Sequence, residues 1–151
     1  MKKFSFTLQS VYEYKLTVEK LQKAELKKAQ EALALLLAEE QQIKNSQSQN
    51  EQSLAEGIEK GEDIPRIMAE HDAYFRFLRE WLEKVRDEIY LAEEHKNECE
   101  ARLIKTMKEL KTYLKLKDEQ YREYLKEVQI EEEKNMGNLV SFKTIDKSDK
   151  S

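Results

Sequence analysis

Apolar residues recur at alternating spacings of three and four along almost the whole chain. That period, close to 3.5 residues, is typical of helices that supercoil around a partner helix. The pattern breaks once, around Gly57 to Pro65, where the only proline and two of the three glycines lie. The sequence therefore predicts an all-α fold, a long antiparallel coiled-coil hairpin of two helices. The second helix would present the series Ile64, Ile67, His71, Tyr74, Leu78, Leu82, Val85, Ile89, Ala92, Cys99, Leu103, Leu110 and Tyr113.

The first helix is expected over about residues 7–56, with Thr7 or Ser10 as its N-cap. Eleven residues separate Val18 from Ala29, which predicts a stutter near 22–25 that locally unwinds the supercoil. The polar stretch 44–53 is either a weakly packed helix or a surface for a partner. The expected inward series is Val11, Tyr14, Val18, Leu21, Leu26, Ala29, Leu33, Leu36, Glu40 and Ile43.

The turn is expected over residues 57–64, where glycines permit left-handed backbone at a helix end. Asp63 can cap the second helix, and Pro65 suits its first turn. This helix is expected over about residues 65–135, with Gly137 as its stop. Residues 1–137 would then form a single hairpin domain, and 138–151 a flexible tail.

The two predicted helices differ in length, about 75 Å against about 105 Å at ~1.5 Å per residue. With the turn near residue 60, Leu8 should lie opposite about Tyr113. The second helix would then overhang by about twenty residues, including Tyr121, Tyr124, Leu125, Val128 and Ile130. An isolated helix with exposed apolar side chains indicates a binding element. The alternative is that the first helix and its N-terminal arm extend further, or that the overhang frays.

Composition favours a coiled coil over a compact core, with 38% charged and 39% hydrophobic residues. The net charge of −4 argues against nucleic acid as a partner. Residues 39–100 carry eight basic and 17 acidic side chains, whereas residues 102–117 carry six basic and one acidic. Residues 1–28 are also basic, with seven Lys against three Glu. The hairpin is therefore expected to have an acidic tip and a basic base. These charges are either solvated helix faces or fields that attract different partners.

No catalytic, metal or cofactor site is expected, and the chain is interpreted as a non-enzyme. His71 and His95 would lie about 36 Å apart along one helix, too far to share a metal ion. Cys99 is the only cysteine and lies on the predicted seam, and the three glycines leave no room for a phosphate-binding loop. No secretory signal or membrane span is found, so a cytoplasmic location is expected, with any membrane contact made through another protein.

An aromatic cluster over residues 74–82 exceeds what a two-helix seam can bury. The seam can accommodate Tyr74, Leu78 and Trp81 or Leu82, but not Phe75 and Phe77 as well. The surplus aromatic residues form either a site for a partner or a surface for self-association.

The two ends of the chain carry short motifs. The chain opens Phe4-Ser5-Phe6-Thr7-Leu8-Gln9-Ser10-Val11, followed by heptads rich in Ala and Leu, and Glu131-Glu132-Glu133-Lys134-Asn135-Met136 lies near its other end. With these features the sequence resembles the flagellar export protein FliJ family over essentially its full length. It departs from the family pattern at Gly137 and the polar segment that follows.

The resemblance implies a stalk-like component of the flagellar type III export apparatus, similar to the central stalk of rotary ATP synthases. Its partners would be a hexameric export ATPase, a membrane export-gate protein and export chaperones, at the inner face of the cell membrane. The base would bind the ATPase through Phe4, Phe6, Leu8, Tyr121, Tyr124 and Val128. The tip would bind the gate through Gln41, Tyr74, Phe75, Leu78 and Trp81.

Two other functions stay open at the level of sequence. The first is a structural or adaptor coiled coil that self-associates into a four-helix bundle, burying Phe75 and Phe77 between hairpins. The second is an amphipathic binder of membrane surfaces, which the basic stretch 102–117 permits weakly because its apolar residues are needed for the seam.

Overall fold

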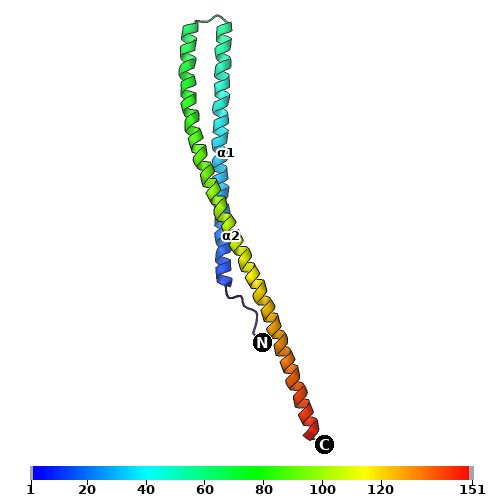
Figure 1. Cartoon of the computed structure of the whole chain (residues 1–151). Helices are drawn as coiled ribbons and strands as arrows, with labels where there is room; N and C mark the ends of the chain where they lie inside the picture. The colour runs from blue at the N-terminus through cyan, green and yellow to red at the C-terminus, as the bar shows by residue number, and fades with distance from the viewer. Residues whose placement is uncertain (1, 150–151) are drawn as a thin grey trace. The chain divides into compact units, whose positions relative to one another are not determined.

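Two long helices make up almost all of the described chain (Figure 1). The computed structural model describes residues 2–149, with side chains as far as Ser141. Helix α1 spans Gln9–Glu59 and helix α2 spans Ile64–Asp149, and residues 2–149 contain no strand. The prediction of an all-α, two-helix hairpin is confirmed.

The chain divides into two compact units. Lys20–Ile104 form the first, here named the hairpin unit, in which α1 and α2 run antiparallel on either side of the turn. The residues up to Glu19 and those from Lys105 onward form the second, here named the terminal unit. The terminal unit therefore joins segments that are far apart in the sequence.

The hairpin unit is held together by one apolar cluster. Ile43, Leu78 and Val85 are its most deeply buried large side chains. Burying a side chain of this kind contributes about 1.5–3 kcal/mol, so a few such residues supply much of the stability of a two-helix structure. The buried members of the cluster are Leu33, Ile43, Leu78, Leu82, Val85 and Ile89.

The inward face of α2 follows the heptad more strictly than its apolar pattern suggests. Phe75 is half-buried next to buried Leu78, whereas Tyr74 is exposed. The expectation that Tyr74 lies in the seam is therefore wrong. The physical reason is spacing, because a strict alternation of four and three from His71 to Leu82 passes through 75 and 78.

The start of α1 also differs from expectation. Val11, Tyr14 and Leu21 are exposed, at 40%, 66% and 62%, while Lys15 and Gln22 are half-buried. Residues 12, 15, 19, 22, 26, 29 and 33 are all buried or half-buried, which is an unbroken heptad. The predicted stutter near 22–25 is therefore wrong: the helix keeps its face and places polar side chains on it.

The turn between the helices is a Schellman motif. The Glu62 backbone N–H donates to the Gly57 carbonyl at 3.3 Å, and that of Gly61 donates to the Ile58 carbonyl at 3.2 Å. Gly61 has φ of 69°, the left-handed conformation that this motif requires. The Asp63 carbonyl accepts from Ile67 N–H at 3.0 Å, which places Asp63 at the N-cap of α2 as expected. The turn is shorter than predicted because α1 continues past Gly57 to Glu59.

The outer ends of both helices differ from their predicted positions: α1 begins at Gln9, two residues later than expected, and α2 ends later than expected. Neither Thr7 nor Ser10 occupies the N-cap of α1, because the Leu8 carbonyl accepts the bond from Tyr12 N–H at 2.9 Å. Helix α2 passes through Gly137 and continues to Asp149, so the predicted end at about 135 is wrong. A glycine inside a helix costs about 1 kcal/mol relative to alanine, which a long helix tolerates. The predicted tail, 138–151, is therefore helical to residue 149, and its last two residues lie outside the described part of the chain.

Candidate protein-interaction surfaces

An aromatic cluster joins the N-terminal arm, residues 2–8, to α2 in the terminal unit. The Phe4 ring lies 5.1 Å from that of Tyr121, edge to face, and 5.5 Å from that of Tyr124. The two tyrosine rings stack on each other at 6.2 Å, and Tyr124 Oη donates to the Lys2 carbonyl at 2.9 Å. Edge-to-face and offset aromatic pairs are favourable beyond the area they bury. We name Phe4, Tyr121 and Tyr124 the base cluster.

Polar contacts continue the pairing of the arm and α1 with α2. Thr7 and Gln120 exchange side-chain hydrogen bonds at 3.3 and 3.4 Å. Lys117 Nζ donates to Gln9 Oε1 at 3.5 Å, and Lys15 Nζ lies 2.6 Å from Glu109 Oε2. Leu8, between Thr7 and Gln9, therefore lies opposite residues 117–120 of α2. The expected partner, Tyr113, is wrong by four to seven residues, or about one to two helical turns.

This register changes the interpretation of the overhang. The arm reaches along α2 as far as Tyr124, so the aromatic residues expected to be unpaired contact Phe4. The alternative in which the N-terminal arm extends further is therefore correct for this part of α2. Beyond Val128, residues 129–141 are exposed, with Ile130 at 63% and Met136 at 68%.

The six residues predicted to bind an ATPase all lie in the terminal unit. Phe4, Leu8, Tyr124 and Val128 are half-buried, and Tyr121 is 43% exposed. Phe6 is only 6% exposed, so it serves the packing of the arm and offers almost no surface to a partner. The structure thus brings the predicted set into one unit but reserves much of it for internal contacts.

A groove of about 940 Å³ runs between the arm and α2. Phe4 and Val128 give it an apolar floor together with Tyr124. Its lining charges are mixed: Lys2 and Lys3 come from the arm, and three glutamates come from α2. These are Glu123, Glu127 and Glu131, spaced one turn apart on a single helix face. Sequence reasoning found the aromatic residues but not these acidic ones, whose four-residue spacing was the available signal.

A second aromatic group lies on the outer surface of α2 in the hairpin unit. The rings of Tyr74 and Phe77 stack at 6.4 Å, and those of Phe77 and Trp81 lie at 6.0 Å. Tyr74 is 45% and Phe77 58% exposed, while Trp81 is half-buried and its Nε1–H donates to Glu39 Oε1 at 3.0 Å. We name Tyr74, Phe77 and Trp81 the aromatic row. Phe77 was absent from the predicted gate-binding set.

That predicted set is only partly assembled by the structure. Leu78 belongs to the hairpin core with no exposed surface, so its assignment to a binding site is wrong. Phe75 is half-buried in the seam, which leaves Tyr74 and Trp81 as the members of the set that reach the outer surface of α2.

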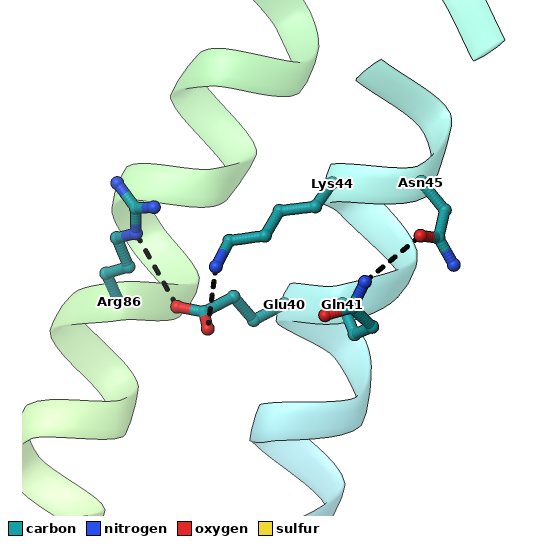
Figure 2. A network of polar contacts seen from close by, with 5 residues as sticks. All are labelled: Glu40, Gln41, Lys44, Asn45 and Arg86. Atoms are coloured by element: carbon teal, nitrogen blue, oxygen red, sulfur yellow. Dashed lines mark hydrogen bonds and ion pairs between the residues drawn. The ribbon is translucent and has the colours of Figure 1, made fainter. Parts of the chain in front are cut away.

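The fifth member, Gln41, lies on another flank of α1. It follows Glu39, the partner of Trp81, by two residues, or about 200° around the helix. Its Nε2 donates to Asn45 Oδ1 at 3.1 Å, a bond that Figure 2 shows within a group of polar contacts. There Glu40 lies 3.5 Å from both Lys44 Nζ and Arg86 Nε.

The histidines and the cysteine have structural contacts. Asn50, 6% exposed, donates from Nδ2 to the His71 carbonyl at 3.2 Å and accepts from His71 Nδ1. Cys99 is 2% exposed, which confirms its place on the seam, and its Sγ lies 3.8 Å from His95 Nε2. Within the described residues, no three His, Cys, Asp or Glu side chains are grouped so that they could hold a metal ion.

Within residues 2–149, no helix combines the length and the apolar composition that a membrane span requires.

Comparisons with known proteins found no match. Neither a protein-family model, nor a curated protein, nor a solved structure matches the sequence or the fold.

Proposed function

We propose that this protein is a non-enzymatic, stalk-like component of the flagellar type III export apparatus. Its base, the terminal unit, binds the hexameric export ATPase. The tip, which is the turn end of the hairpin unit, contacts the membrane export gate, and the protein escorts export chaperones. In this proposal it works at the cytoplasmic face of the cell membrane and contacts the membrane only through its partners.

One observation carries the proposal, namely that the opening motif of the chain lies on the far part of α2. Phe4 contacts both Tyr121 and Tyr124, and the Lys2 carbonyl accepts a hydrogen bond from the hydroxyl of Tyr124. A partner that binds this unit therefore contacts the N-terminal arm and the far part of α2 at the same time. The motif with Phe4, Phe6 and Leu8 is also the segment that carries the resemblance to FliJ proteins.

The base groove has chemistry suited to a protein partner. Its apolar floor offers contact area, and its lining carries three glutamates against Lys2 and Lys3, an excess of negative charge that favours a basic segment on the partner. Aromatic residues at the centre of such a surface supply most of the binding energy in typical interfaces.

A binding measurement with the purified hexameric ATPase tests the base. Tyr124→Ala removes one ring from the base cluster and one wall of the groove, so we expect at least about tenfold weaker binding. Tyr121→Ala, at 43% exposure, should act in the same direction.

The control is Tyr90→Ala, which removes an exposed tyrosine from the hairpin unit and should leave binding unchanged. Circular dichroism establishes that each variant keeps its helix content. Equal affinity of the wild-type protein and the Tyr121→Ala/Tyr124→Ala double variant would remove the assignment of the base as the ATPase-binding element.

A further inference from the structure

In the aromatic row, Tyr74 and Phe77 present apolar surface that the hairpin itself does not use, while half-buried Trp81 anchors the row against the hairpin core. Tyr74, Phe77 and Trp81 follow one another at spacings of three and four, so they form one stripe on α2. Their ring contacts join neighbours on the same helix, while Leu78 of the same segment lies in the hairpin core. A hollow of about 330 Å³ lies beside Phe77 and Trp81, with Glu80 and Lys84 on its rim.

The charged residues that extend this stripe are arranged with opposite signs about Phe77. Glu70 lies seven residues before Phe77 and Lys84 seven residues after it. Arg66 lies eleven residues before Phe77 and Glu88 eleven residues after it. At 100° per residue all four fall on the same face as Phe77, and all four are exposed.

We propose that the aromatic row is a docking surface for a second copy of this chain, related by a two-fold axis through Phe77. In that arrangement the two copies of α2 run antiparallel. Residues equally far before and after the axis then meet, so Glu70 faces Lys84 of the other copy. By the same symmetry Arg66 faces Glu88, and the two Phe77 rings meet at the centre. Tyr74, three residues before the axis, packs within one residue of Trp81, which lies four residues after it.

The charge pattern selects this orientation against the parallel one. In a parallel pair each residue meets its own copy, so Glu70 would face Glu70 and Lys84 would face Lys84. The antiparallel pair turns each of these repulsions into an attraction, and it does so at four places because the interface is isologous. The aromatic rings supply the contact energy and the charges set the direction.

This inference does not rest on the proposed role in flagellar export. A hairpin paired in this way covers the row, so a second copy and any other partner of the row exclude each other. Whether the chain belongs to an export apparatus and whether it pairs through Phe77 can therefore be tested independently.

Sedimentation equilibrium of the full chain over a range of concentrations tests the pairing. We expect a reversible dimer for the wild-type protein and a dissociation constant at least about tenfold higher for Phe77→Ser. Tyr90→Ser, at 61% exposure on another face of α2, is the matched control and should dimerise like the wild-type protein. Phe77 is exposed, so its replacement should leave the helix content unchanged.

A charge-swap experiment tests the antiparallel register. Glu70→Lys alone and Lys84→Glu alone each place like charges opposite one another in the homodimer, and each should weaken it by about threefold to tenfold. In a heterodimer of the two variants, positions 70 and 84 of one copy are both basic and those of the other copy are both acidic. Every contact between position 70 and position 84 then joins opposite charges, so the mixture should recover wild-type dimerisation.

Three results would overturn the proposal. The first is a wild-type chain that stays monomeric at the highest attainable concentration. The second is a dimer that Phe77→Ser leaves intact, and the third is a mixture of charge variants no more dimeric than its separate components. A monomeric chain that loses a membrane protein from its cellular partners on Phe77→Ser would assign the row to that partner instead.

Discussion

At the scale of single residues, the seam is marked by polar side chains in inward positions. Asn50 and His71 pair across the hairpin, and Lys15 pairs with Glu109 in the terminal unit. Each interaction joins two residues far apart in the sequence. A polar residue at an inward position typically fixes the register of a coiled coil at some cost in stability. These pairs therefore specify which residues of α2 face which residues of α1.

The pair of Asn50 and His71 gives a prediction with an internal control. Asn50→Ala leaves the His71 ring N–H without its acceptor in a part-buried position, so the free energy of unfolding should fall by about 1–3 kcal/mol. Asn45→Ala removes an exposed hydrogen bond to Gln41 on the same helix and should change the free energy of unfolding by less than about 0.5 kcal/mol. Urea denaturation followed by circular dichroism compares the two variants. Equal effects would mean that the buried amide does not contribute to register or stability.

The pair of Lys15 and Glu109 predicts a pH dependence. The hydrogen bond from Lys15 lowers the pKa of Glu109 below its ordinary value of 4.5, and the same bond raises the pKa of Lys15 above 10.5. The contribution of the Glu109 carboxylate to the stability of the fold is therefore present above pH 4.5 and is lost as the pH falls through the lowered pKa. The contribution of the Lys15 ammonium group to stability is present below pH 10.5 and is lost as the pH rises through the raised pKa.

The measurement is the thermal unfolding midpoint of the wild-type protein against that of Glu109→Gln across the pH range. The wild-type protein should be more stable between the two limits, and the difference should vanish in acid below the pKa of Glu109. High salt should leave part of the difference, because both side chains are only about a third exposed. A difference that is the same in strong acid and at neutral pH would exclude the ion pair as its source.

At the scale of helices and turns, two of the glycines have opposite roles. Gly61 ends α1 with a left-handed backbone, whereas Gly137 lies within α2 with open space around it. Sequence reasoning assigned a helix end to both, because glycine permits the left-handed backbone found at helix ends. A glycine ends a helix only where the following chain supplies the closing hydrogen bonds, as Gly61 and Glu62 do.

The two glycines should respond to alanine in opposite directions. Gly61→Ala forces a side chain into a left-handed backbone and should lower the free energy of unfolding by about 1 kcal/mol. Gly137→Ala improves helix propensity without a clash and should raise helix content, with a gain of about 0.5–1 kcal/mol for the local helix. Circular dichroism and thermal unfolding measure both. A loss of helix content in Gly137→Ala would contradict a continuous α2.

The sequence predicted which elements form better than which faces they bury. Two helices, the position of the turn and the central core residues Ile43, Leu82 and Val85 follow from the heptad spacing alone. The exact buried face of each helix does not follow from the spacing, because neighbouring apolar residues such as Tyr74 and Phe75 compete for one inward position. The choice depends on continuity with His71 and Leu78, which only the packed pair of helices settles.

The same difficulty limited prediction of the candidate sites. Leu78 and Gln41 were grouped with the aromatic residues on sequence, but a helix turns by about 100° per residue, which separates residues on different flanks. The reach of the N-terminal arm along α2 was also underestimated. Nothing in the spacing of α1 indicates that residues 2–8 continue along α2 to reach Tyr124.

At the scale of the whole molecule, burial is unevenly distributed along α2. Its middle carries the hairpin core, whereas residues 129–139 are all exposed. Helices without tertiary contacts are marginal in water, and local opening is favoured where few apolar contacts hold the backbone. A segment of this kind is suited to being ordered by a partner.

Hydrogen–deuterium exchange gives the corresponding prediction. Backbone amides of residues 129–139 should exchange much faster than those of residues 78–89, and addition of the partner of the base should slow the former. The hairpin core serves as the internal control, since its exchange should be unaffected by that partner. Equal protection of both segments in the isolated chain would contradict the exposure of this part of α2.

The proposed place of this chain in a flagellar export apparatus can be tested in cells. The most direct test is co-purification from a flagellated bacterium with an affinity tag inserted beside Gly61, so that the base cluster stays unmodified. We expect recovery of an export ATPase together with an integral export-gate protein, and loss of the ATPase with Tyr121→Ala/Tyr124→Ala. Recovery of the tagged chain alone, or with itself as its sole partner, would contradict the claim and favour a self-associating structural coiled coil.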